Sequence, residues 1–186
     1  MTSSPQTRTQ RASQRLAALF VLLGVVGFLP LNSSVQGAQN PEPVRLESFT
    51  LADQFGTHHA VTFPRERPLL LVVGDRRGSE EIDAWIPPLK ERWKDLADMH
   101  GIADVQAVPR FLRGRITEAI RKSRPKPLLL DFEGRVTSAL PCEKKAANIF
   151  AISKEGRILA HVFGPFVPGT NAQQKLDRIA QAFASP

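Results

Sequence analysis

The chain has 186 residues, a formal net charge of +7 and one cysteine, Cys142. A single cysteine excludes an internal disulfide, and the length after export fits one domain with a core of ordinary size. The moderate positive charge favours anionic partners in general.

The first 37 residues have the pattern of an export signal. Arg8, Arg11 and Arg15 precede an apolar stretch at 16–29, and small residues follow at 35–37. The apolar stretch is shorter than the roughly 20 residues that span a bilayer. We therefore expect cleavage after residue 37 and a periplasmic or secreted protein. An uncleaved signal that anchors the protein to the outer face of the inner membrane is the alternative.

Removal of the signal leaves 149 residues with a net charge of +4, because the signal holds three arginines and no acid. Residues 38–45 contain two prolines and few apolar side chains, so we expect a flexible lead. The folded domain is predicted at 46–186. Export argues against nucleic acid as a partner, and the membrane would be contacted only through an uncleaved signal.

The domain begins with a predicted pair of short strands and a buried strand. Apolar and polar side chains alternate briefly in residues 49–56, and this segment ends at a glycine. Residues 60–63 are expected to form the second strand of the pair. Residues 69–73 are continuously apolar between Pro68 and Gly74, which indicates a strand buried on both faces of a sheet.

Two helices and a strand are predicted next. Apolar residues recur at helical spacing over 82–96, although Pro87 and Pro88 should kink or split this helix. A strand is expected at 102–108. A second amphipathic helix follows at 112–120 and ends before the proline at 125.

The last part predicts a strand, a hairpin and a helix. Residues 128–130 are a short buried strand, and 148–153 pairs with 157–163 around a Lys-Glu-Gly turn. Thr170 and Gln173 have the spacing of a capping box at the start of the final helix. This order predicts an α/β fold in three layers, with a mixed sheet flanked by helices on both faces.

The order and spacing of these segments resemble the thioredoxin-like superfamily, on the side of peroxiredoxins and Sco-type copper-assembly proteins, over 46–183. The pairing of the segment at 130–135 with the later hairpin is also similar to YtfJ-type exported proteins. The resemblance is carried by the segments at 51–56, 69–73, 128–131 and 150–158.

The chain differs from this family at the position of the family's reactive cysteine. The resemblance implies a reactive cysteine at the junction of the central strand and the first helix, yet residues 74–83 contain none. A Sco-type copper site would need a cysteine pair in the same loop. The family's cis-proline is also missing, with Ala147 near its position. We therefore expect neither disulfide exchange nor peroxide reduction in the family's way, and no cofactor.

Cys142 is the remaining candidate for catalysis. It lies in a predicted loop beside Lys144 and Lys145, which would lower the pKa of its thiol and make it reactive. In that case a sulfenic acid or mixed disulfide would form on Cys142 and a partner would resolve it. The alternative is a half-buried cysteine that only packs.

Two sets of residues are candidates for binding. Arg76, Arg77 and Ser79 at the start of the first helix would hold a carboxylate or phosphate, although neighbouring acids would also neutralise the arginines. The second set lies in the basic stretch at 110–126, which is suited to an anionic surface or an acidic envelope protein but is also typical of a solvated helix face. Its candidate residues are Arg121, Lys122 and Arg124.

No metal site is predicted. His58 and His59 are adjacent, so on a strand their rings point to opposite faces, and the other histidines are isolated. Two functions remain: a non-catalytic binding or adaptor module of the cell envelope, which we favour, and a thiol-dependent oxidoreductase with one cysteine.

Overall fold

The structure is a computed structural model that describes residues 44–184. The predicted signal and most of the predicted lead lie outside these residues and stay predictions. Within the described range, no helix is long and apolar enough to cross a membrane.

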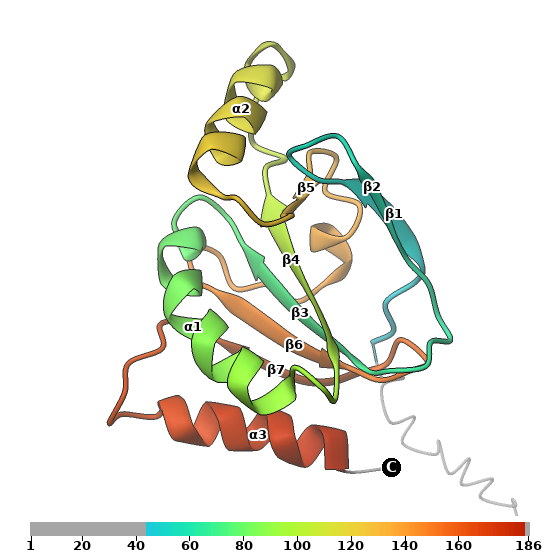
Figure 1. Ribbon diagram of the computed structural model, residues 1–186, viewed down its shortest axis with the longest axis vertical. Coiled ribbons are helices and arrows are strands. Elements are labelled where there is room, and N and C mark those ends of the chain that lie inside the picture. Colours follow the sequence, from blue (N-terminus) through green and yellow to red (C-terminus); the bar gives the residue numbers. More distant parts are fainter. Residues whose placement is uncertain (1–43, 185–186) are drawn as a thin grey trace, which may run out of the picture. The chain divides into compact units, whose positions relative to one another are not determined.

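A five-stranded mixed sheet forms the centre of the domain (Figure 1). In spatial order its strands are β5 (Leu129–Asp131), β4 (Asp98–Asp104), β3 (Leu69–Gly74), β6 (Asn148–Ile152) and β7 (Ile158–Phe163). The first three are parallel, β6 runs antiparallel to β3, and β7 runs antiparallel to β6 and therefore in the direction of β3. The predicted mixed sheet with a closing hairpin is confirmed.

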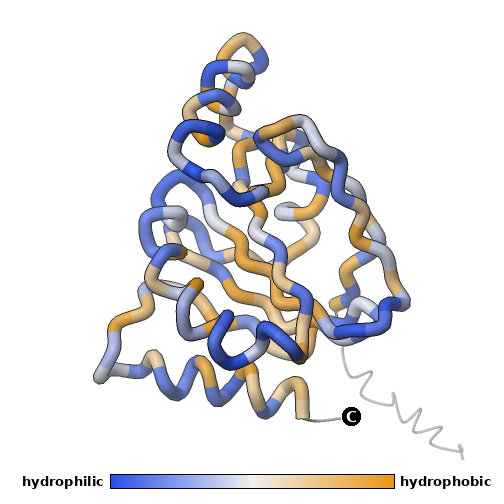
Figure 2. The backbone as a smooth tube through the Cα atoms, viewed as in Figure 1, coloured by the Kyte–Doolittle hydropathy of each residue, from blue (hydrophilic) through white to orange (hydrophobic). Residues whose placement is uncertain are grey.

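The central strand β3 is buried along its whole length, as its continuous apolar sequence predicts. Leu70 and Val72 join one apolar cluster, whereas Leu69, Leu71 and Val73 join a second cluster on the opposite face. Hydrophobic residues consequently run along the central strands (Figure 2).

The two faces of the sheet are covered differently. Helices α1 (Gly78–Trp93) and α3 (Ala172–Ala184) pack on one face (Figure 1). The other face is covered by the hairpin of β1 (Phe49–Ala52) and β2 (His58–Val61) and by the segment that holds the short 3-10 helix η2 (Thr137–Ala139). The sheet is therefore the middle of three layers, as predicted, but the second face is covered by a hairpin and a 3-10 helix where an α-helix was expected.

Helix α2 (Arg113–Ser123), preceded by the 3-10 helix η1 (Arg110–Leu112), buries no residue completely. It projects beyond the carboxyl end of β4 (Figure 1). The predicted helix exists and ends before the proline, but its apolar side chains at Leu112, Ile116 and Ile120 are only half-buried. Part of the sheet face beside α1 is consequently left uncovered by helix.

Three local predictions differ from the structure. Helix α1 is not split, since it runs through Pro87 and Pro88. The prolines cannot bond the carbonyls four residues earlier, but those belong to exposed residues that water can reach. Strand β4 begins and ends four residues before its predicted limits, because pairing with β3 sets its position. Thr170 does not cap α3, since its hydroxyl donates to the Val167 carbonyl at 2.6 Å.

Candidate functional site

The junction between β3 and α1 is closed by a carboxylate of the chain itself. Asp75 Oδ1 accepts the N–H groups of Arg77 at 3.0 Å and Gly78 at 2.8 Å, and Oδ2 accepts that of Lys145 at 2.8 Å. Burial raises the pKa of Asp75, but the three backbone hydrogen bonds outweigh it and hold the pKa below its ordinary value. An ionised carboxylate therefore uses the amides that would stabilise a thiolate in a redox relative.

The same junction has no space for a side chain at Gly78. A Cβ atom built there would lie 2.2 Å from the carbonyl oxygen of Ala146, in the segment before β6. Glu81 Oε2 also accepts the Ala147 N–H at 3.0 Å, which joins the first turn of α1 to that segment. The only cis peptide among residues 44–184 is Phe63–Pro64, so the family's cis-proline has no counterpart here.

The predicted anion-binding residues lie at this junction. The side chains of Arg76 and Arg77 are exposed and make no ion pair with any described residue. The Ser79 hydroxyl donates to the Arg76 carbonyl at 2.8 Å, and the Ser79 N–H donates to the Asp75 carbonyl at 2.9 Å. Two guanidinium groups are thus available to an anion, whereas much of the helix start is already in use.

Cys142 packs away from this junction. Its side chain is half-buried and joins the apolar cluster on the sheet face opposite α1. Burial, and to a smaller degree the charge of Asp104, raise the pKa of the thiol to about 12. The lysines at 144 and 145 were expected to lower this pKa, so the direction is opposite to the prediction. At neutral pH the group is a thiol, which is a weak nucleophile.

The three candidate residues of the basic stretch have different surroundings. Arg121 Nε donates to the Gln54 carbonyl at 3.1 Å. Arg124 forms an ion pair with Asp83 of α1. Lys122 is exposed and lies 3.7 Å from Glu118 on the same helix. Arg121 and Arg124 therefore hold α2 in place, which the sequence did not predict.

Some of these residues share one groove. It has a volume of about 1900 Å³ and lies between α1 and α2, with β4 at its floor; we call it the α1–α2 groove. Arg76, Arg77, Ser79 and Arg124 line it, whereas Arg121, Lys122 and Cys142 do not. The structure thus brings together four of the predicted site residues and separates the candidate thiol from them.

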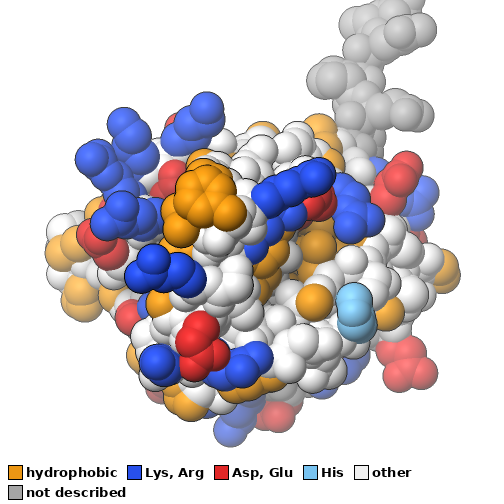
Figure 3. Space-filling model, turned by 90° about the horizontal axis from the view of Figure 1, so that it is seen from above, with side chains coloured by type: hydrophobic (Ala, Val, Ile, Leu, Met, Phe, Trp, Pro, Cys, Tyr) orange, Lys and Arg blue, Asp and Glu red, His pale blue; other side chains and the backbone are white. Residues whose placement is uncertain are grey.

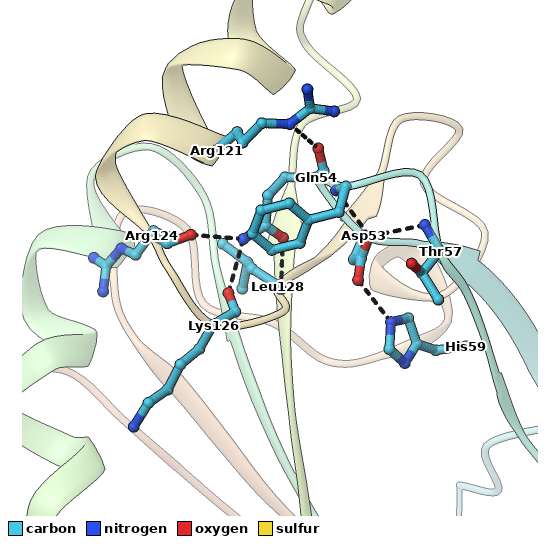
Figure 4. Close-up of polar contacts among 9 residues, drawn as sticks. Asp53, Gln54, Thr57, His59, Arg121, Arg124, Lys126 and Leu128 are labelled. Carbon is cyan, nitrogen blue, oxygen red and sulfur yellow. Dashed lines mark hydrogen bonds and ion pairs between the residues drawn. The ribbon is translucent and has the colours of Figure 1, made fainter.

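Gln54 is a structural residue that sequence reasoning missed (Figure 4). Its side chain is fully buried, and Nε2 donates to the carbonyls of Arg124 at 2.9 Å and Lys126 at 2.7 Å. Its Oε1 accepts the Leu128 N–H at 2.8 Å. One side chain thus fixes the loop between α2 and β5. A glutamine in a short strand-and-turn segment gave no signal of this role.

Asp53, the neighbour of Gln54, fixes the β1–β2 turn (Figure 4). It accepts hydrogen bonds from the backbone of Phe55 and Thr57 and lies 2.8 Å from His59 Nε2. Burial raises the pKa of Asp53, but these hydrogen bonds outweigh it and hold the pKa below its ordinary value. No group of three His, Cys, Asp or Glu side chains in the described part of the chain is arranged to hold a metal ion.

Comparison with known proteins identifies likeness at the level of structure. No family model matches the sequence, and no curated protein matches it either. Among solved structures, a Chlorobium tepidum protein assigned as the thiol:disulfide interchange protein DsbE is 11% identical, with a TM-score of 0.55 over 76% of this chain and 96% of that one. The exposed lipoprotein thioredoxin of Streptococcus pneumoniae is 13% identical, with a TM-score of 0.53 over 72% and 98% of the two chains. Peroxidoxin BcpB of Mycobacterium tuberculosis is 16% identical, with a TM-score of 0.50 over 75% and 96%. At these identities the likeness shows the fold alone, and it confirms the predicted fold class.

Proposed function

We propose that this chain, which has a thioredoxin-like fold with a single cysteine, is a binding module without redox catalysis. The observation that carries the proposal is the closure of the β3–α1 junction by Asp75, whose carboxylate accepts the amides of Arg77, Gly78 and Lys145. A thiolate at that position would compete with a carboxylate already bound there.

The chemistry of Cys142 supports the same proposal. A thiol with a pKa of about 12 is almost entirely protonated at neutral pH, and thiolate is the form that attacks peroxides and disulfides. Cys142 also packs on the sheet face opposite α1, away from the dipole of that helix. A single-cysteine oxidoreductase remains the alternative function, and no observation favours it.

The proposed place of action is outside the cytoplasm, in the cell envelope. This rests on the positive, apolar and small-residue regions of the first 37 residues. Mass spectrometry of the protein from a periplasmic extract should give a chain that begins at Ala38. Recovery of the intact chain in the membrane fraction would instead support the anchored form.

The absence of redox catalysis is tested with the protein in its exported form. Reduction of insulin disulfides and consumption of hydrogen peroxide should match the blank without protein, while a dithiol thioredoxin serves as the active control. Maleimide should label Cys142 more slowly than a cysteine in a short peptide, because the buried thiol has a raised pKa. Peroxide consumption above the blank that disappears in Cys142→Ser would refute the proposal.

A further inference from the structure

The α1–α2 groove has apolar walls and a floor of small residues. On the α2 wall, apolar residues recur with helical spacing at Leu112, Ile116 and Ile120. Ile82 and Ile86 of α1 lie on the opposite wall. Gly101 and Ala103 of β4 are part of the floor and leave depth between the walls. Half-buried apolar residues of α2 that join neither apolar cluster of the core therefore line an open groove.

Polar contacts at both ends of α2 keep the groove open. At the first turn, Arg113 donates to Glu133 at 2.5 Å and to the Phe132 carbonyl at 3.0 Å. At the last turns, Arg121 bonds the Gln54 carbonyl and Arg124 pairs with Asp83. These contacts hold α2 beyond the end of the sheet, so the groove is formed before any ligand arrives.

The lining of the groove carries an excess of positive charge. Figure 3 looks onto the α2 end of the domain and shows Lys and Arg side chains crowded there, with hydrophobic side chains visible in a hollow between them. The cationic lining residues are Arg76, Arg77, Lys90, Arg124, Lys126, Lys144 and Lys145. The acids among the lining residues are Asp75, Asp83 and Asp104. Asp75 is engaged with backbone amides, Asp83 with Arg124, and Asp104 with Gln106. Seven cationic groups against three carboxylates leave the lining with a net excess of four positive charges.

Lys90 of α1 and Lys126 of the α2–β5 loop both line the groove, and their side chains lie close together. The nearby ammonium group of Lys126 lowers the pKa of Lys90, and neither lysine has an acidic partner among the described residues. Two like charges in such a position repel each other until an anion lies between them. A carboxylate is the simplest group that would relieve the repulsion.

The volume of the groove and the unpaired edge of β4 indicate which class of anion the groove can hold. The groove is larger than the roughly 300–1,000 Å³ of small-molecule sites. Strand β5 pairs with β4 only at residues 102–104, so residues 98–101 have no strand on that side within the described domain. His100 and Gly101 from this unpaired edge line the groove. Backbone groups there match a peptide, which can hydrogen-bond them, better than a lipid tail, which cannot.

We propose that the α1–α2 groove binds an acidic amphipathic peptide segment of a partner protein. Apolar side chains of the segment contact Ile116 and Ile86, and its carboxylates lie near Lys90 and Lys126. This inference rests on the proposed binding function, since it names the site and the class of ligand.

The test uses fluorescein-labelled synthetic peptides of 14 residues and the protein in its exported form. One peptide alternates leucine and glutamate, as an extended segment paired with the edge of β4 requires, a second has lysines in place of the glutamates, and a third has serines in place of the leucines. Fluorescence anisotropy should show binding of the first peptide only. Ile116→Asp and the double variant Lys90→Glu with Lys126→Glu should each weaken it by about tenfold or more. The matched controls Leu96→Asp and Lys94→Glu, outside the groove lining, should change affinity by less than about twofold.

Four results would overturn the inference. If the lysine peptide binds as tightly as the glutamate peptide, the groove does not select an acidic ligand. If the control variants weaken binding as much as the groove variants do, the peptide does not bind in the groove. Binding to phosphatidylglycerol vesicles but to no peptide would identify a lipid surface. Sedimentation showing a dimer that Ile116→Asp dissociates, with no peptide binding, would identify a second copy as the occupant. None of these results restores redox catalysis, so the inference can fail while the redox assays still support a non-catalytic module.

Discussion

Replacement of Gln54 by leucine should destabilise the domain and release the loop that follows α2. The buried amide makes three hydrogen bonds to backbone groups of Arg124, Lys126 and Leu128, at 2.9, 2.7 and 2.8 Å. Leucine has a similar volume but leaves all three backbone groups without these partners. At about 1 kcal/mol for each lost hydrogen bond, the free energy of unfolding should fall by about 3 kcal/mol. For a domain of this size the melting temperature should fall by roughly 6–12 °C.

Urea denaturation measures this loss, and hydrogen exchange measures where it acts. The amide protons of residues 121–124, 126 and 128 should exchange faster in the Gln54→Leu variant, while those of β3 and β6 should change only through the lower global stability. Gln173→Leu is the control, because Gln173 is exposed and bonds only Asp177 on its own helix. If both variants lose less than about 0.5 kcal/mol, Gln54 does not fix the loop and the reasoning is wrong.

Two further predictions concern Gly78 at the β3–α1 junction and His161 of β7. Gly78→Cys should destabilise the protein by roughly 1–3 kcal/mol in urea denaturation, because its Cβ would lie 2.2 Å from the Ala146 carbonyl oxygen, and the new thiol should not reduce insulin; an unchanged stability would contradict this. His161 stacks on Phe150 and is half-buried, and burial holds its pKa below the ordinary value of about 6.5. The folded state then favours the neutral ring, so its contribution to stability is complete above about pH 6.5 and is lost as pH falls toward the lower folded-state pKa. His161→Gln should flatten this acid-side loss in denaturation curves between about pH 7 and pH 5, and an equally steep loss in the variant would refute the assignment.

The elements that could be predicted from the sequence are those whose structure is decided by residues close together in the chain. Strand β3 is buried on both faces, so its aliphatic run between Pro68 and Gly74 left few alternatives. The β6–β7 hairpin was also predictable, because its two apolar runs are separated by a glycine turn at Gly156 with a positive φ of 90°. In both cases the residues that decide the structure are neighbours in the chain.

The site could not be predicted in the same way, because its contacts join distant segments through the backbone. Asp75 bonds the amide of Lys145, 70 residues later, and Gln54 bonds carbonyls 70 and 72 residues away. Backbone groups carry no sequence signal. The basic stretch was read as a surface, whereas Arg124 is committed to Asp83 of α1, a partner that is visible only in three dimensions.

The β3–α1 junction differs from that of a redox protein with this fold in its packing as well as in its lack of a cysteine. Placing a cysteine at Gly78 would require the Ala146 carbonyl to move, since the added Cβ atom would lie 2.2 Å from its oxygen. Even then, Asp75 would still hold the amides of the first turn and would repel a thiolate. Removing Asp75 alone frees the amides but adds no sulfur and breaks the link to Lys145. A thiol site at this junction would therefore need at least two coordinated changes, so a single substitution should not create catalysis.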